Sequence, residues 1–125
     1  MYQRKTEKEI TCPIEYGLDI FGGKWKSRII CVLAAGGVMR YNALRGELGN
    51  ITDAVLAAML KEMAADGMVA RTQYDTIPPK VEYALTDKGK SVLPILQAVC
   101  QWSRAYAVPN RENALAPCKI CTQWT

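Results

Sequence analysis

The stretch "ITDAVLAAMLKEMAADGMVARTQYDTIPPKVEYALT", residues 51–86, contains the signals that decide the fold. Thr52 is a good N-cap residue, and the apolar side chains after it recur at helical spacing, which predicts a helix with Gly67 as its C-cap. Two strand-like runs follow, "MVARTQY" and "VEYAL", which predict a β-hairpin directly after the helix. The apolar stripe expected to face the core of the domain comprises Val55, Leu56, Met59, Leu60 and Met63.

The loop of this hairpin contains two adjacent prolines, Pro78 and Pro79, where a plain hairpin would use a short turn such as Asn-Gly. Proline removes backbone freedom, so the loop is expected to be stiff. Lys80 stands at its edge, where its ammonium group could reach a phosphate or enter a minor groove of DNA. A stiff surface loop with a solvated lysine is the alternative, and the helices before the hairpin favour the first interpretation.

Three helices are predicted upstream, over residues 13–21, 24–35 and 40–49, and glycine pairs at 22–23 and 36–37 separate them. The third is joined to the helix after Thr52 by the tight connection "GNI", which matches helix-turn-helix geometry. A hairpin placed after the second helix of such a motif is a wing.

Downstream, Thr86 is expected to cap one long helix over residues 87–106, kinked at Pro94 because proline cannot donate back to Lys90. This helix is too apolar for one covered face, so we expect a second copy of the chain to cover the other in a C2 dimer. Its apolar residues are Val92, Leu93, Ile95, Leu96, Val99, Cys100, Trp102 and Tyr106.

The predicted fold is therefore mainly α with a small β-hairpin, an α+β winged helix-turn-helix that dimerises through its terminal helices. We expect an N-terminal arm over residues 1–11, the winged domain over 12–107 and a C-terminal tail over 108–125.

Composition is compatible with this architecture. A chain of 125 residues favours one domain, and 16 Lys and Arg against 12 Asp and Glu give a mild basic excess that suits a polyanionic partner. The chain contains no histidine, which argues against a catalytic triad or a His-bound metal, so neither an enzyme nor a cofactor is predicted. The charged start "MYQRKTEKE" is not a signal peptide, and no uncharged stretch is long enough for a bilayer, which predicts a cytoplasmic protein.

Five cysteines in a cytoplasmic chain are not expected to form structural disulfides. Cys12 precedes Pro13 at the start of the first helix, where amide groups without helical partners stabilise a thiolate. Cys12 is therefore a candidate redox sensor, and an inert, half-buried thiol is the alternative. Cys31 and Cys100 lie on apolar faces and are interpreted as packing residues.

The tail contains the motif "CKIC", Cys118 to Cys121. One CxxC could be half of a zinc site, a redox pair or part of an unstructured tail. Zinc requires four ligands, so a second chain or Cys12 would have to contribute to such a site, and no metal site is assigned.

Four pieces of the chain, in order, carry a family resemblance: "CPIEYGLDIFGGKWK", "RYNALRGEL", "LAAMLKEMAADGMVART" and "IPPKVEYALTDKGKSVLPIL". Between Cys12 and about Tyr106 the chain resembles the HxlR-type winged helix-turn-helix regulators of bacteria, a MarR-like group. The resemblance implies a homodimeric transcription factor that binds double-stranded DNA, and members often repress. Several members sense oxidants, electrophiles or aldehydes through the cysteine before that proline, which is Cys12 here.

In a winged helix, the second helix of the motif enters the major groove. Relatives usually carry Arg, Lys or Gln where Ala54 stands, and Thr or Ser where Ala57 stands. Alanine can touch a thymine methyl group but cannot form hydrogen bonds with its side chain, so more of the specificity is expected from DNA shape. Helix propensity alone is the alternative reason for these alanines. The candidate contacts of this helix are Thr52, Asp53, Ala54, Ala57 and Lys61.

Phosphate contacts are expected from Lys24, Arg40, Arg45 and Lys80, each of which alone would be read as a solvated surface charge. The leading hypothesis is a sequence-specific regulator, most simply a repressor, that binds a pseudo-palindromic operator and is switched at Cys12 by a small oxidant or electrophile. Two alternatives remain open: a small thiol redox or zinc-binding protein that uses Cys118 and Cys121, and a winged-helix module whose alanine-rich helix faces a protein partner.

Overall fold

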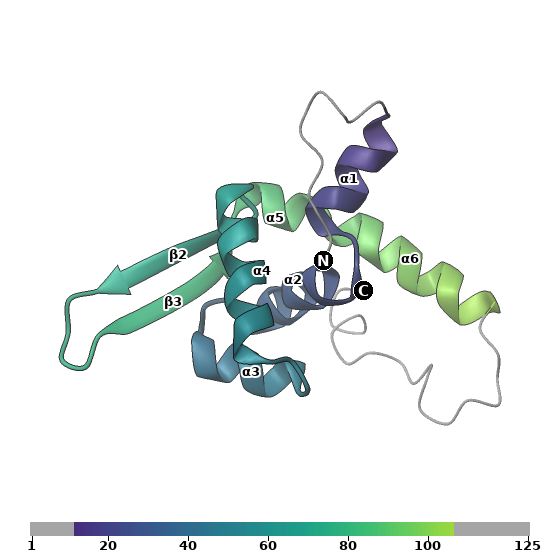
Figure 1. Ribbon diagram of the computed structural model, residues 1–125. Helices are drawn as coiled ribbons and strands as arrows, with labels where there is room; N and C mark the ends of the chain where they lie inside the picture. Colours follow the sequence, from purple (N-terminus) through teal and green to yellow (C-terminus); the bar gives the residue numbers. More distant parts are fainter. Residues whose placement is uncertain (1–11, 107–125) are drawn as a thin grey trace.

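A computed structural model describes residues 12–106 of the chain as a group of helices with a small sheet at one side (Figure 1). The N-terminal arm, the tail with its CxxC and residue 107 lie outside the described residues. The elements in chain order are α1 (Pro13–Phe21), α2 (Lys24–Gly36), β1 (Met39–Arg40), α3 (Tyr41–Leu48), α4 (Asp53–Ala65), β2 (Val69–Tyr74), β3 (Lys80–Leu85), α5 (Asp87–Ser91) and α6 (Leu93–Tyr106).

The sheet has three antiparallel strands in the order β1-β3-β2. In the hairpin, Val69 of β2 pairs with Leu85 of β3 at the base, and Tyr74 pairs with Lys80 beside the loop. The hairpin extends away from the helices as a wing, while α1 and α6 lie at the opposite end of the molecule (Figure 1). The winged helix-turn-helix expected from the sequence is confirmed.

The core lies mainly between α2, α3, α4 and the base of the sheet, and its buried side chains are apolar except for those of Asp19 and Lys26. Leu56, Leu60 and Met63 turn one face of α4 inward, as their helical spacing predicted. Val55 was expected in the same stripe, but its side chain is 36% exposed because its position turns toward the flank of the helix. The prediction for Val55 is therefore wrong.

The ends of α4 follow its capping residues. The Thr52 hydroxyl accepts a hydrogen bond from the Val55 amide at 3.2 Å, which confirms the predicted N-cap. The C-cap is Asp66 rather than Gly67. Gly67 follows it with φ of 75°, a left-handed conformation that glycine adopts without strain, so this glycine turns the chain from α4 toward β2.

The strand β1 was not expected from the sequence. Met39 pairs with Tyr83 and Arg40 with Glu82, so the sheet has three strands where a two-stranded hairpin was predicted. Arg40 consequently belongs to β1 and is the N-cap residue of α3, which begins one residue later than predicted. A strand of two residues is too short to show an alternating pattern. Its pairing partners also lie more than forty residues away in the sequence, so no local signal marks the strand.

The predicted long last helix is two helices, α5 and α6, separated at Val92. Pro94 lies in the first turn of α6, where a missing amide hydrogen costs nothing. The Leu96 amide then donates to the Val92 carbonyl at 3.0 Å and starts the new helix. The prediction of one continuous helix kinked at Pro94 is therefore wrong: the helix is interrupted at Val92, and Pro94 lies at the start of the next helix.

Candidate nucleic-acid interface

The outward face of α4 is a surface of small and charged side chains between α3 and the hairpin. The predicted contact residues of this helix are all exposed: Thr52, Asp53, Ala54, Ala57 and Lys61. Nothing in the described part of the chain covers them, so the helix is available to a groove of DNA.

The start of α4 is tied to α3 through Asp53. The Tyr41 hydroxyl donates to Asp53 Oδ1 at 3.0 Å, and Arg45 Nε lies 3.1 Å from the same oxygen. Burial, followed by the hydrogen bond to Asp53, raises the pKa of Tyr41. Two predicted DNA contacts, Arg45 and Asp53, therefore engage each other in the unbound protein, so a phosphate would have to share the Arg45 guanidinium with Asp53.

The wing has a polar network at the outer end of its strands. Lys80 Nζ lies 3.3 Å from Glu82 Oε2 and 4.9 Å from the centroid of the Tyr74 ring. The hydrogen bond from Tyr74 lowers the pKa of Glu82, and the same bond raises the pKa of Tyr74. These contacts fix the Lys80 side chain on the wing, next to the loop.

The wing loop, residues 75–79, carries an exposed apolar tip. Ile77 is fully exposed, and the Ile77–Pro78 peptide bond is cis. The Thr76 hydroxyl donates to the Pro78 carbonyl at 2.8 Å, which closes the loop on itself.

Arg71 was missed in the sequence. It lies on β2 beside a hollow of about 330 Å³ between α4 and the sheet, whose walls also include Tyr41, Ala57 and Lys61. Its guanidinium donates to Gln73 Oε1 at 3.3 Å. Alternation along β2 could have revealed it, because Arg71 is two residues after the buried Val69 and so shares its face, toward α4.

Lys24 lies apart from the hairpin side of α4. Its Nζ is 4.7 Å from the centroid of the Trp25 ring, and it lines a groove between α1, α2 and the flank of α4 that carries Met59 and Glu62. Arg40 is exposed at the start of α3. The structure thus groups Arg40, Arg45 and the outward residues of α4, with Lys80 on the adjoining wing and Lys24 on another flank.

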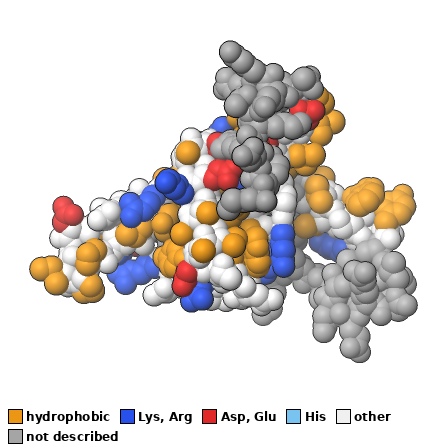
Figure 2. Space-filling view, viewed as in Figure 1, with side chains coloured by type: hydrophobic (Ala, Val, Ile, Leu, Met, Phe, Trp, Pro, Cys, Tyr) orange, Lys and Arg blue, Asp and Glu red, His pale blue; other side chains and the backbone are white. Residues whose placement is uncertain are grey.

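A second exposed surface lies at the opposite end of the molecule, where apolar side chains gather over α1 and α6 (Figure 2). On α6 the spacing of the exposed residues places them along one stripe, and exposure rises from 48% at Ile95 to 74% at Tyr106. Ile14 and Leu18 on α1 are 69% and 59% exposed. The surface, called the apolar end below, comprises Ile14, Leu18, Ile95, Val99, Trp102 and Tyr106.

The three cysteines within residues 12–106 are partly buried thiols: Cys12, Cys31 and Cys100. Cys12 is the N-cap residue of α1, and its side chain makes no capping hydrogen bond. Cys31 packs against the core, as predicted for a packing residue. Over the same residues, no group of three His, Cys, Asp or Glu side chains could hold a metal ion, and no helix is long and apolar enough to cross a membrane.

The chain matches the model of a known protein family. The family described as HxlR-like helix-turn-helix matches residues 20–111, which include every element from the end of α1 onward. Among curated proteins, an HTH-type transcriptional regulator of Halalkalibacterium halodurans is 43% identical over 112 residues, covering 90% of this chain and 96% of that protein. The regulator YdzF of Bacillus subtilis is 41% identical over 98 residues, with 78% and 90% covered.

Solved structures agree with these matches. The redox regulator HypR in its oxidised form superposes with a TM-score of 0.69 at 39% identity, covering 75% of this chain and 96% of that one. The reduced form of the transcriptional regulator YodB from Bacillus subtilis gives a TM-score of 0.70 at 29% identity, covering 82% of this chain and 100% of that one.

Proposed function

The chain belongs to the HxlR-like helix-turn-helix family of transcriptional regulators, and we propose that it represses transcription as a homodimer on a pseudo-palindromic operator. The observation that carries the proposal is the exposed outward face of α4 next to a wing that holds Lys80 and Arg71. A helix of this kind enters a major groove while the wing follows the backbone. Such a protein acts on the chromosome and hence in the cytoplasm.

The apolar end supports the homodimer. A contiguous apolar surface of this kind is costly to expose to water, and the stripe on α6 with Ile14 and Leu18 of α1 would be covered by the same surface of a second copy. Because this surface lies opposite the wing, two copies joined there leave both α4 helices uncovered (Figure 1). A symmetric pair then presents two α4 helices to half-sites about one helical turn apart, roughly 34 Å.

Repression would follow from binding of the dimer to the operator. A dimer seated on two half-sites that overlap a promoter excludes the transcription machinery without any further contact. The alanines at positions 54 and 57 give few hydrogen bonds to bases, so DNA shape and phosphate contacts supply much of the affinity.

Cys12 is the proposed switch. It is a partly buried thiol at the start of α1, and α1 contributes Ile14 and Leu18 to the apolar end. HypR and YodB, two structural neighbours, are described as a redox regulator and as a regulator solved after diamide treatment. Oxidation or alkylation of Cys12 by a small oxidant or electrophile would change how α1 packs and so change the dimer.

A mobility-shift titration against the intergenic DNA upstream of the protein's own gene tests the proposal. Wild-type protein should give a retarded complex, and Lys61→Ala and Arg71→Ala should each weaken it, whereas the matched control Arg104→Ala at the far end of α6 should not. Repeating the titration after oxidation, with Cys12→Ser beside wild type, tests the switch separately. Absence of any complex with all upstream fragments would contradict the proposal.

One observation favours a second candidate function, a winged-helix module that binds a protein. The outward face of α4 is rich in alanine, and Asp53 and Arg45 are paired with each other, which leaves fewer free charges than a DNA-reading helix usually presents. DNA binding in the titration above separates the two candidates.

A further inference from the structure

The hollow of about 330 Å³ between α4 and the sheet is built from one stripe of the helix and one pair of residues across the hairpin. On the sheet side, Arg71 of β2 pairs with Tyr83 of β3, so both side chains stand on the same face. The stripe on α4 lies opposite them and recurs at helical spacing. It consists of Ala57, Leu60, Lys61 and Ala64.

The charge around the hollow is positive. Lys61 and Arg71 are the charged side chains that line it, and neither forms an ion pair within residues 12–106. At its margin the Tyr41 hydroxyl donates to Asp53, but that carboxylate also lies 3.1 Å from Arg45 Nε. Two positive charges are therefore available to an anion, and a phosphate group suits such a pair because it carries close to two negative charges.

Tyr83 adds a recessed hydroxyl. Its side chain lines the hollow and is only 8% exposed, and no hydrogen bond within the described residues uses its hydroxyl. A tyrosine buried to this extent usually has a hydrogen-bond partner, and an anion inside the hollow would supply one. A phosphate of duplex DNA can meet the exposed Lys61 and Arg71 at the surface, whereas the recessed hydroxyl requires a smaller anion that enters the hollow.

The helix side of the hollow is apolar between its charges. Leu60 is 2% exposed, and the alanines at 57 and 64 present only methyl groups. Inorganic phosphate would leave these groups in contact with water, so an anion that also has a compact apolar body gains by covering them. The volume lies at the small end of the range for small-molecule sites.

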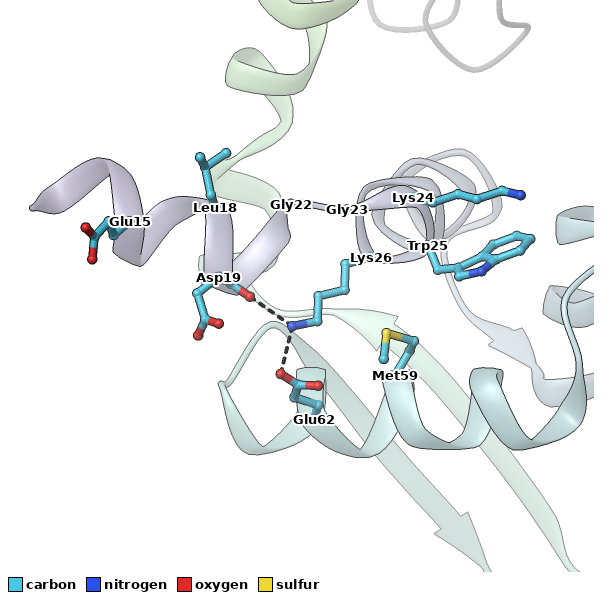
Figure 3. Close-up of a pocket in the computed structure, with 10 residues that line it drawn as sticks. All are labelled: Glu15, Leu18, Asp19, Gly22, Gly23, Lys24, Trp25, Lys26, Met59 and Glu62. Atoms are coloured by element: carbon cyan, nitrogen blue, oxygen red, sulfur yellow. Dashed lines mark hydrogen bonds and ion pairs between the residues drawn. The ribbon is translucent and has the colours of Figure 1, made fainter. Parts of the chain in front are cut away.

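A larger groove, on the other flank of α4, is less suited to an anion (Figure 3). The carboxyl-bearing side chains of Glu15, Asp19 and Glu62 line it, so an anion there would have to approach acceptor oxygens. The lining of the hollow contains no carboxylate, which favours the hollow over this groove.

We infer that the hollow binds an organic phosphate monoester, with its phosphate among Lys61, Arg71 and the Tyr83 hydroxyl and its compact apolar body against the alanines of α4. Lys61 and Arg71 are also proposed contacts of the DNA backbone. A bound phosphate monoester would therefore compete with DNA for the same cations and weaken binding to the operator, a consequence that rests on the proposed function.

A titration followed by amide chemical shifts tests the inference on the full chain without DNA, at neutral pH and constant ionic strength. The probe is phenyl phosphate. Inorganic phosphate presents the charge without the ring, and benzylammonium presents the ring with the opposite charge. We expect saturable shifts in α4 and β2, with phenyl phosphate at least about fivefold tighter than inorganic phosphate because the ring covers apolar surface. Benzylammonium should not saturate.

Tyr83→Phe removes the recessed hydroxyl without changing any charge, and Tyr16→Phe makes the same change on α1, where the hydroxyl contacts Lys88 instead. Circular dichroism checks that both variants are folded. The first should weaken phenyl phosphate at least about fivefold, as expected for a lost hydrogen bond to a charged group, and the second should not.

Arg71→Gln and Arg104→Gln each remove one positive charge, the first in the hollow and the second at the far end of α6. The first should weaken phenyl phosphate at least about tenfold relative to the second. Absence of saturation, equal affinity for inorganic phosphate, or equal losses within either pair of variants would each overturn the inference. A chain that binds phenyl phosphate as expected but binds no upstream DNA would retain this site and lose the proposed function.

Discussion

The two ends of the molecule are built from different kinds of surface. At the end formed by α4 and the wing, polar side chains are tied to one another, as Asp53 is to Tyr41 and Arg45. At the apolar end, side chains such as Trp102 and Tyr106 stand exposed, with only a ring contact of 5.4 Å between the centroids of these two. The difference indicates that the first end is prepared for a polar, hydrated partner and the second for an apolar one.

The largest effect is expected at the apolar end. Trp102→Asp places a charge in the middle of the stripe on α6, where a dimer would bury it without a partner. The dimer dissociation constant should rise by about 100-fold or more, measured by sedimentation equilibrium. Gln101→Asp, which adds the same charge beside the stripe, should leave dimerisation within about threefold of wild type. If the wild-type protein is wholly monomeric at low concentration, the apolar end is not a dimer interface.

The next effect concerns the link between the two ends. Lys26 ties the Asp19 carbonyl of α1 to Glu62 of α4, and a substitution of Lys26 removes a largely buried positive charge from beside the Glu62 carboxylate. Lys26→Met should lower the free energy of unfolding by about 2 kcal/mol, reduced from the fully buried case because Glu62 is 25% exposed.

Lys24→Met is the matched control for that change, since Lys24 is exposed and only stacks on Trp25. It should change the free energy of unfolding by less than about 0.5 kcal/mol. Urea denaturation of both variants measures the difference, and equal losses would show that Lys26 does not link α1 to α4.

A smaller effect is expected for single charges at the DNA end. Arg71→Ala should weaken operator binding about tenfold at moderate salt and make the slope of log affinity against log salt shallower by about 0.9. Fluorescence anisotropy at several salt concentrations measures both quantities. An unchanged slope would mean that Arg71 makes no phosphate contact.

The smallest effect is the pH dependence of the wing. The hydrogen bond from Tyr74 lowers the folded-state pKa of Glu82 below its ordinary value of 4.5. The ionised Glu82 carboxylate therefore contributes fully to the stability of the folded protein above pH 4.5, and this contribution is lost as the pH falls through the lowered pKa. Glu82→Gln should remove this dependence of hairpin order, followed by amide chemical shifts of β2 and β3, whereas Glu47→Gln should not. Identical acid profiles for wild type and Glu82→Gln would contradict the role of Glu82.

The sequence predicts the parts of the fold whose signals are local. The cap at Thr52, the stripe of Leu56 and Leu60, and the alternation in β3 each lie within a few residues and appear in the structure as expected. The parts that were missed depend on distant partners: β1 exists only because Met39 meets Tyr83.

The candidate site shows the same limit. Sequence position identified α4 and the wing as exposed elements with basic residues, but it treated each charge as independent. The pairing of Arg45 with Asp53 and the hollow beside Arg71 arise from packing between elements, which no local pattern contains.

Hydroxyl-radical footprinting of the reduced protein on the upstream intergenic DNA tests the central claim most directly, namely that two copies joined at the apolar end place two α4 helices on one duplex. The expected result is two protected patches about one helical turn apart, related by a two-fold axis, that shrink together in Arg71→Ala. A single unsymmetric patch, or no protection on any upstream fragment that a mobility-shift titration covers, would contradict it.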